Sequence, residues 1–334
     1  MFKKYLVTGA TGFLGRAVIN QLLENKAVVY ALTLENDPLV KELPNEVNAV
    51  IGNVCDKSSL NCFFADADHQ TCVIHCAGIV SVASRPGEKI YKVNVEGTKN
   101  IVELCEEYRV GKLVHVSSVH AIPEKPHGEV ITEDAVFAPD LVKGDYAKSK
   151  AIATSLVFDA TKRGLNASVV FPSGIIGPGD NGNGSVSNML ISFLSGKLPL
   201  AVKGGYDFVD VRDVALGIIA TAEKGQPGQG YILSGHYTSV KDILQIAKEV
   251  ANLKRKTVYL PIIFAKLVAP IYEKITLRKN KTLFFTPYAI AVLISNGNFS
   301  CNKAVNNLGY NPRPIESTIK DTVLWLKDKI QENK

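Results

Sequence analysis

The sequence has no cysteine pattern that is typical of a metal site. Its six cysteines include no CxxC pair, and the spacing of Cys72 and Cys76 is not matched by a histidine cluster. We therefore expect no bound metal. The composition favours reduced, partly buried thiols in a cytoplasmic protein.

Long apolar runs are missing as well. The N-terminal residues lead into a glycine-rich turn, which is not the apolar core of a signal peptide. The longest uncharged run, 282–302, is interrupted by Pro287, Asn296, Gly297 and Asn298. We therefore expect neither a secretion signal nor a membrane span.

No segment repeats, and neither glycine nor proline is strongly enriched. The chain has 334 residues, of which 46% are hydrophobic, so it can bury a large core and is not intrinsically disordered. Its net charge of +6 is concentrated in residues 254–281, where eight basic residues and one acidic residue give +7. The rest of the chain is close to neutral, which does not favour nucleic-acid binding.

Apolar, β-rich segments alternate with helical patterns in the first half of the chain. We predict strands at 4–8, 27–32, 47–51, 71–75, 112–116 and 167–171, and helices at 16–25, 57–65, 88–108 and 146–163. This alternation predicts an α/β fold, in which helices cover both faces of a doubly wound parallel sheet of the Rossmann type.

The pattern changes after Pro172, although a helix at 213–224 and a strand at 230–234 are still predicted. We expect a nucleotide-binding domain at 1–171, joined by 205–250. Residues 172–204 and 251–334 are expected to form a smaller, mostly helical substrate-binding lobe.

Three glycines, Gly9, Gly12 and Gly15, lie between the first predicted strand and the first predicted helix. Glycines at this spacing permit a tight turn and a close approach of a pyrophosphate to backbone amides. The helix N-terminus then offers free N–H groups and the positive end of its dipole to the phosphates. The motif therefore predicts a dinucleotide site.

Tyr146 and Lys150 are four residues apart in a predicted helix, so both side chains can point into one site. A nearby ammonium group favours the phenolate form of a tyrosine, as does a positively charged nicotinamide. Ser117 and Ser118 follow a predicted strand, at the sheet edge where α/β proteins bind their ligands.

Taken together, these motifs resemble the extended branch of the short-chain dehydrogenase/reductase superfamily, and the resemblance covers nearly the whole chain. Further matching segments are 52–56, 75–78, 93–100, 172–180, 208–215 and 308–312. The resemblance implies that Tyr146 is the catalytic acid/base and that Lys150 lowers its pKa and binds the nicotinamide ribose. It also implies that Ser118, rather than Ser117, positions the substrate oxygen. Asn94 is either a fourth catalytic residue or a structural residue that bonds to the backbone.

The resemblance implies NAD(P)(H) as the cofactor. The matching cofactor-binding positions, besides Tyr146 and Lys150, are Gly9, Thr11, Gly12, Phe13, Leu14, Gly15, Asn53, Val54, Cys76, Ala77, Gly78, Ser117, Pro172, Ser173 and Gly174. Asn53 stands where the family usually has Asp. Glu35 lies about 20 residues past the glycines, where an acid that grips the ribose 2′-hydroxyl favours NAD over NADP. We therefore expect a slight preference for NAD.

The substrate is expected to be a small molecule. Sugar dehydratases of this superfamily carry an Asp-Glu pair after the catalytic hydroxyl, whereas Val119 and His120 follow Ser118 here. Sugar epimerases usually hold a diphosphate with an Asn and an Arg, at places that look like Gly174 and Tyr206.

Segments 209–213 and 230–235 are most similar to the dihydroflavonol reductase and hydroxysteroid dehydrogenase-like group. We therefore expect an oxidoreductase that interconverts a secondary alcohol and a ketone on an apolar skeleton. A nucleotide-sugar epimerase and a non-catalytic, cofactor-sensing protein are the alternatives. His120 is interpreted first as a polar loop residue and second as a substrate contact, and His75 as a hydrogen-bonded core residue.

The basic segment also carries apolar residues at helical spacing between Ile262 and Ile275, and a second apolar set follows at 283–294. We favour first a helical lobe that packs on the sheet with a solvated basic face. An apolar substrate pocket comes second, and a peripheral contact with anionic lipid is the least favoured. A homodimer that pairs through the helices of Asn94 and Tyr146 is expected from the family.

Overall fold

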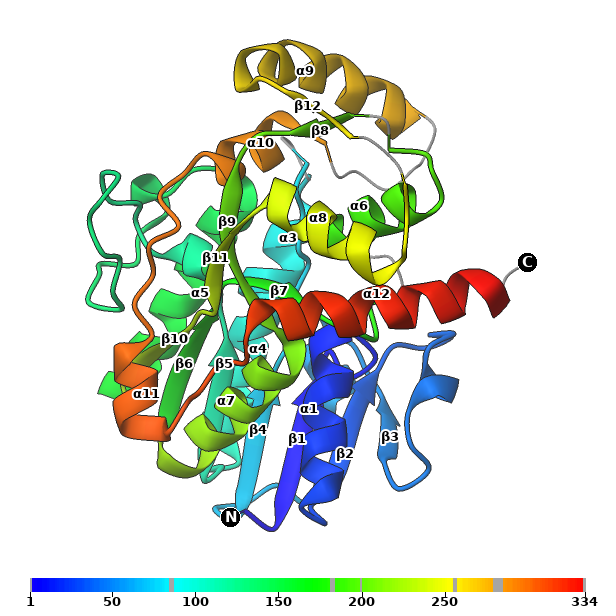
Figure 1. Cartoon of the computed structure of the whole chain (residues 1–334). Coiled ribbons are helices and arrows are strands. Elements are labelled where there is room, and N and C mark those ends of the chain that lie inside the picture. The colour runs from blue at the N-terminus through cyan, green and yellow to red at the C-terminus, as the bar shows by residue number, and fades with distance from the viewer. Residues whose placement is uncertain are drawn as a thin grey trace.

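A seven-stranded, fully parallel sheet forms the centre of the computed structural model, which describes residues 2–83, 87–180, 184–198, 200–254, 257–278 and 285–332 (Figure 1). Across the sheet the strands are β10 (Gly230–Leu233), β6 (Ala167–Pro172), β5 (Lys112–Val116), β4 (Thr71–His75), β1 (Lys4–Thr8), β2 (Val28–Thr33) and β3 (Asn48–Ile51). The order reverses between β4 and β1, which is where doubly wound sheets bind ligands.

Both faces of the sheet are buried. In β1, Tyr5 and Val7 belong to one apolar core and Leu6 belongs to the other, because successive side chains of a strand point to opposite faces. Helices α1 (Phe13–Glu24) and α7 (Val211–Lys224) cover the first face. Helices α4 (Gly97–Glu107) and α5 (Asp145–Lys162) cover the second (Figure 1). The predicted doubly wound fold is confirmed.

The predicted strands 4–8, 71–75 and 112–116 match β1, β4 and β5 residue for residue. The predicted helix 57–65 is a 3-10 turn (Lys57–Leu60) followed by α2 (Asn61–Phe64). The predicted helix 88–108 consists of α3 (Lys89–Tyr91), a π-helical turn (Lys92–Glu96) and α4. Single π-helical turns are frequent at functional sites, and this one carries Asn94.

The C-terminal region is helical, as predicted, but it also contains two small sheets that were not predicted. One sheet has the order β11 (His236–Ser239), β9 (Gly205–Asp210), β7 (Gly174–Ile176), and the other pairs β12 (Val258–Leu260) with β8 (Leu200–Val202). The helices of this region are α6 (Ser185–Leu194), α8 (Val240–Val250), α9 (Ile262–Arg278), α10 (Pro287–Leu293), α11 (Asn302–Leu308) and α12 (Ile315–Glu332).

The favoured interpretation of this segment is a helical lobe that packs on the sheet. Helix α9 departs from it, because most of its large apolar side chains are exposed. Four basic residues of segment 254–281 lie outside the described residues, as do two members of the apolar set at 283–294. They are Arg255, Lys256, Lys279 and Lys281, and Leu283 and Phe284. In the described part of the chain, no helix combines the length and the apolar composition needed to cross a membrane.

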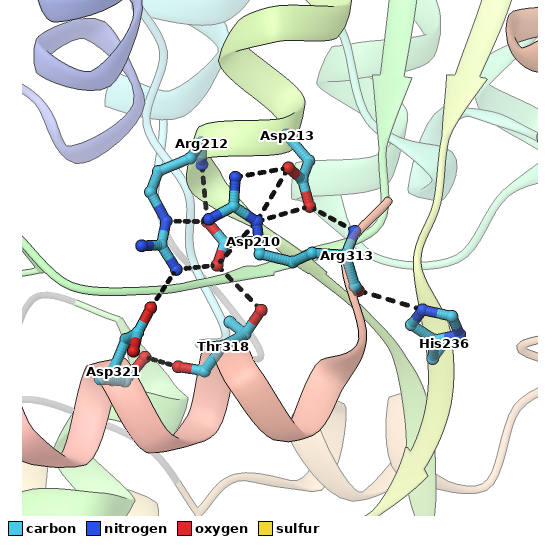
Figure 2. Close-up of polar contacts among 8 residues, drawn as sticks. Asp210, Arg212, Asp213, His236, Arg313, Thr318 and Asp321 are labelled. Atoms are coloured by element: carbon cyan, nitrogen blue, oxygen red, sulfur yellow. Dashed lines mark hydrogen bonds and ion pairs between the residues drawn. The ribbon is translucent and has the colours of Figure 1, made fainter. Parts of the chain in front are cut away.

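A polar network ties α12 to the end of β9 and the start of α7 (Figure 2). Asp210 caps α7 by accepting from the Arg212 N–H at 2.8 Å, and it also accepts from the Thr318 hydroxyl of α12 at 2.8 Å. Arg313 pairs with the buried carboxylate of Asp213 at 2.8 Å. The matched segments 208–215 and 308–312 therefore hold the C-terminal region on the sheet.

The charge state of this network depends on pH. Burial raises the pKa of Asp210, but hydrogen bonds from Arg212 and Thr318 outweigh burial, and the net pKa is lower than usual. A carboxylate with a lowered pKa stabilises the fold at neutral pH. This contribution is lost as the pH falls through the folded-state pKa.

Arg313→Ala is expected to lower the free energy of unfolding by about 2 kcal/mol, because it leaves the buried Asp213 carboxylate without its guanidinium partner. Urea unfolding with an unchanged m-value measures this loss. The control is Arg163→Ala, which removes an exposed ion pair with Glu106 and should change stability by about 0 to 1 kcal/mol. Equal losses in the two variants would contradict the structural role of Arg313.

Candidate functional site

The candidate site lies at the carboxyl ends of β1, β4 and β5. Thr8, His75 and His115 pair in register across these three strands, so the loops that follow them begin at one edge. Those loops contain the glycine turn, residues 76–78 and the Ser117-Ser118 pair. The structure therefore brings together the three motifs that the sequence placed in one site.

The glycine turn is shaped for an anionic group. Gly9 has a φ of +65°, and a Cβ on Gly15 would lie only 2.1 Å from the Gly9 carbonyl oxygen. Gly12 caps α1 without a side-chain hydrogen bond, and the first helical turn, which contains Phe13 and Leu14, holds no acidic residue. The N–H groups at this helix end thus have no side-chain cap, which fits a pyrophosphate.

A buried chain of hydrogen bonds supports the loop after β4. The Thr98 hydroxyl donates to the Asn94 carbonyl oxygen at 2.7 Å, so it accepts from His75 Nε2 at 3.1 Å. His75 Nδ1 must then accept from the Thr8 hydroxyl at 2.7 Å, and Thr8 accepts from the Ala77 N–H at 3.2 Å. Burial lowers the pKa of His75 to about 3, so the ring is neutral. His75 is a hydrogen-bonded core residue, as predicted.

Asn94 holds the same loop through its side chain. Its Oδ1 accepts from the Ile79 N–H at 2.7 Å, and its Nδ2 donates to the Ile79 carbonyl at 3.1 Å and to the Ser149 hydroxyl at 3.0 Å. The side chain is therefore committed to structure. Of the two interpretations of Asn94, this geometry supports the structural one.

Gly78 forms the floor of a cradle between two helices. A Cβ at this position would lie 3.2 Å from Lys150 Nζ and 3.3 Å from Asn94 Oδ1, so a side chain would fill the space in front of the lysine. Within the described chain, Lys150 Nζ donates one hydrogen bond, to the Val116 carbonyl at 2.8 Å. An ammonium group has three N–H donors, so donors remain for a ribose hydroxyl.

The loop after β3 is held by the helix that follows Asn94. Asn100 Nδ2 donates to the Val54 carbonyl at 2.8 Å, and Gly97 allows close contact, since a Cβ there would lie 2.9 Å from Val54 Cγ2. Asn53 is exposed, and its Oδ1 accepts from the Cys55 N–H at 2.9 Å. Asn53 is thus accessible after the edge strand β3, whereas Val54 is buried.

Glu35 and Asp37 occupy different environments after β2. Glu35 is exposed, and no described residue forms a hydrogen bond or ion pair with its side chain. Asp37 accepts from the Thr11 hydroxyl at 2.7 Å and from the Leu39 N–H at 2.9 Å. The carboxylate that lies against the glycine turn is therefore Asp37, which the sequence analysis did not identify.

Arg16 is a second residue that the motif did not reveal. Its guanidinium donates to the Thr11 carbonyl at 3.1 Å and to the Gly179 carbonyl at 2.6 Å, and it pairs with Glu42 at 3.1 Å. Arg16 therefore joins the glycine turn to the loop at 177–180. The signal in the sequence that could have identified Arg16 was its position directly after Gly15.

The two serines after β5 have separate roles. The Ser117 hydroxyl is paired with that of Thr154 at 2.6 Å, inside the interface with α5. The Ser118 hydroxyl accepts from the His120 N–H at 3.2 Å, and it lies near enough to the Tyr146 phenol to act on the pKa of that phenol, which it lowers. This arrangement supports Ser118, rather than Ser117, as the residue that faces a substrate oxygen.

The pKa values at Tyr146 and Lys150 differ from the sequence-based expectation. Burial raises the pKa of Tyr146, and the Ser118 hydroxyl lowers it by less, so the net direction is upward. The expected lowering by Lys150 is not found, because desolvation dominates. Burial also lowers the pKa of Lys150 to about 8.

An aromatic cluster centred on the His120 ring lies beside Tyr146. The His120 ring lies 5.9 Å from Tyr146, 5.7 Å from Tyr206, on which it stacks, and 6.1 Å from Tyr288. Burial lowers the pKa of His120 to about 4, so it is neutral at physiological pH. His120 is half-buried, and its contacts with Tyr206 and Tyr288 support the second interpretation, a substrate contact, over that of a polar loop residue.

Residues Pro172, Ser173 and Gly174 connect β6 to β7 at the same sheet edge. Pro172 ends β6, Ser173 is buried, and its N–H donates to the Leu233 carbonyl at 3.3 Å. A Cβ on Gly174 would lie 2.8 Å from the Phe208 ring. There is thus no room for a polar side chain at the place where sugar epimerases usually carry Asn.

Comparisons with known proteins agree with this geometry. A model of the NAD dependent epimerase/dehydratase family matches residues 5–234. Sterol demethylase protein B of Methylococcus capsulatus is 26% identical over 326 residues, which cover 97% of this chain and 98% of that protein. The 3 beta-hydroxysteroid dehydrogenase type 7 of Homo sapiens is 27% identical over 364 residues, which cover 97% and 95% of the two chains.

A solved structure supports the same assignment. The crystal structure of gox2253 is 29% identical, covers 98% of this chain and 98% of its own, and superposes with a TM-score of 0.83. The glycine turn has the shape that binds the pyrophosphate of a dinucleotide in this fold, and the cradle at Gly78 lies at the same sheet edge. The chain therefore belongs to the NAD dependent epimerase/dehydratase family, as an NAD-dependent dehydrogenase or reductase of the extended short-chain type.

Proposed function

We propose that the protein interconverts a secondary alcohol and a ketone on an apolar, steroid- or dihydroflavonol-like substrate. The observation that carries this proposal is the aromatic cluster beside Tyr146, in which the His120 ring contacts Tyr146, Tyr206 and Tyr288. Pockets for small apolar ligands are lined mainly by such side chains, with a few polar groups that orient the reacting atom. The two relatives named above are also called a sterol demethylase protein and a hydroxysteroid dehydrogenase.

The reacting groups of the chain have separate tasks. In reduction, the Tyr146 phenol donates its proton to the carbonyl oxygen; in oxidation, its oxygen accepts the hydroxyl proton. The Ser118 hydroxyl orients that oxygen, and Lys150 supplies the positive charge at the cradle. A bound nicotinamide dinucleotide supplies or accepts the hydride, and in its oxidised form its positive charge favours the phenolate.

Tyr206 argues against a nucleotide-sugar substrate. A planar guanidinium at this place would bind a diphosphate in a bidentate way, whereas the Tyr206 ring is buried and stacks on His120. Gly174 likewise offers no polar side chain at the position where sugar epimerases usually carry Asn. The epimerase alternative thus loses both groups that usually hold the diphosphate.

A substrate screen tests the proposed reaction. Absorbance of the reduced nicotinamide is followed with NAD and with NADP, using steroids, dihydroflavonols and small aliphatic ketones. Epimerisation of UDP-sugars leaves the cofactor unchanged overall, so it is followed by chromatography of the sugars. We expect turnover of polycyclic alcohols or ketones. Turnover of UDP-sugars alone would contradict the proposal.

Tyr146→Phe is expected to reduce turnover by about 10² to 10⁴-fold while NADH binding is preserved, because only the proton transfer is lost. Turnover is measured under saturating cofactor, and NADH binding by fluorescence. Tyr108→Phe is the matched control, because this ring packs on Phe64 at the end of α4. Turnover of the Tyr146 variant equal to that of the control would exclude Tyr146 as the acid/base.

Asp37→Asn is expected to narrow the preference for NADH over NADPH by about tenfold, because the carboxylate repels a 2′-phosphate and favours a 2′-hydroxyl. The asparagine Oδ1 can still accept from the Leu39 N–H, and its Nδ2 can donate to the Thr11 hydroxyl oxygen, so both contacts of the glycine turn are retained. Fluorescence titration of both reduced cofactors measures the ratio. The matched control is Glu35→Gln; a shift in the ratio confined to that variant would transfer the role back to Glu35.

Tyr288→Ala is expected to raise KM for a polycyclic ketone by about tenfold and to leave KM for a small ketone nearly unchanged, because one wall of the apolar pocket is removed. Phe264→Ala is the control, since this aromatic side chain of the same lobe is 57% exposed. If Tyr288→Ala affected both ketones equally and also lowered the melting temperature, Tyr288 would have only a packing role.

A further inference from the structure

Helix α9 is oriented opposite to an ordinary amphipathic helix. Two small residues lie on its inner side, Ala265 and Ala269, and both are 0% exposed. Its large apolar side chains instead face outward: Ile263 (73% exposed), Phe264 (57%), Leu267 (66%), Val268 (48%), Ile271 (62%) and Ile275 (49%). With 3.6 residues per turn, these six fall within an arc of about 140°. We call this surface the outer face of α9.

The outer face of α9 differs from the other exposed apolar residues of the protein. Exposed residues such as Val80, Val136 and Leu324 lie singly on separate segments, as is normal for a protein surface. Six large apolar side chains on one helix form a contiguous patch instead. Contiguous patches of this kind mark an interaction surface.

The charges of α9 point to the chemistry of the partner. Its exposed charged side chains in the described chain, Lys266, Lys274 and Arg278, are all basic. Its acidic residue, Glu273, is buried at 8% exposure. The surface thus combines large apolar groups with positive charge and offers no carboxylate. An anionic partner with an apolar layer beneath its charges is complementary to both features.

A second copy of the chain fits this surface poorly. A two-fold interface would place the outer face of α9 against itself, so Lys266, Lys274 and Arg278 would meet the same cations of the partner. Like charges across an interface repel unless acidic groups intervene. The anionic surface of a lipid bilayer avoids this conflict, because long basic side chains can reach its headgroups while apolar side chains enter the acyl boundary.

We propose that α9 docks the protein on an anionic membrane surface, with its outer face inserted at the headgroup boundary. Figure 1 shows α9 at the outer end of the C-terminal region, above β8, β12 and α10. Nothing in the described structure covers its outer face. The helix lies along the membrane surface, and Ala265 and Ala269 hold it against the rest of the lobe.

The docking helix is separated from the candidate site by one element. Ala265 and Ala269 pack with Ile290 of α10, and α10 also carries Tyr288, whose ring contacts His120. If the proposed function is correct, an apolar substrate that partitions into the bilayer is concentrated beside this wall of the pocket. Docking itself does not depend on the reaction, so the two proposals can fail separately.

Vesicle sedimentation of the full chain tests the docking proposal. The probes are phosphatidylcholine vesicles, with and without about 30% phosphatidylserine, at low and high salt. We expect binding to the anionic vesicles, weakened by salt. Absence of binding to these vesicles at low salt would overturn the proposal.

Two pairs of variants separate the apolar and charged contributions. Leu267→Gln with Ile271→Gln is expected to reduce the bound fraction at least tenfold, whereas Leu216→Gln with Leu324→Gln, which are 46% and 43% exposed on α7 and α12, should leave it unchanged. Lys266→Glu with Lys274→Glu should abolish the preference for phosphatidylserine. The control pair, Lys241→Glu on α8 with Lys320→Glu on α12, makes the same change in net charge. It should preserve most of the preference for phosphatidylserine.

The same variants are examined without lipid. Because the substituted side chains are exposed, melting temperatures should not fall, and sedimentation in solution should be unchanged. Equal losses of vesicle binding in a test pair and its matched control would overturn the assignment to α9. Conversion of a dimer into a monomer by the Leu267 and Ile271 changes would identify a second copy as the occupant and would also overturn the proposal.

Discussion

The hydrogen-bond chain from Thr8 through His75 and Thr98 to Asn94 is the interaction on which the geometry of the site depends. It crosses from β1 to β4 and to the π-helical turn, so it fixes three separate segments relative to one another. Each buried polar atom in it has a partner, which avoids the cost of about 1 to 3 kcal/mol for an unsatisfied group. Loss of any member would loosen the loop at residues 76–79, which forms the floor of the cofactor cradle.

The features that could be predicted from the sequence are those encoded locally. Alternating buried strands, the glycine turn and the Tyr146-Lys150 spacing each depend on a few consecutive residues, and the structure contains all three. The small strands β7, β9 and β11 were not predicted, because each is only three to six residues long and pairs with residues distant in sequence. Short strands gain their stability from such non-local pairing and carry little signal of their own.

The substrate side of the site could not be predicted for a related reason. His120, Tyr206 and Tyr288 come from three segments of the chain, and only the tertiary fold brings their rings into one cluster beside Tyr146. The orientation of helix α9 could not be predicted from the sequence for a different reason. A period of 3.6 residues reveals that a helix has an apolar face, but it does not reveal whether this face points toward the core or away from it. In α9 the alanines at 265 and 269 occupy the inner face, so the larger residues must lie outside.

The ionisable side chains at Tyr146 are uncharged, which matches the aromatic character of the cluster. Burial keeps the His120 ring neutral and raises the pKa of the Tyr146 phenol, so both carry no charge at neutral pH. Tyr206 and Tyr288 are held neutral by the same desolvation. A charged substrate would lose its hydration against this wall without gaining an opposite charge, whereas a neutral polycyclic substrate would lose little. Under the proposed function, this desolvation would select against charged substrates and keep on Tyr146 the proton that reduction of a ketone requires.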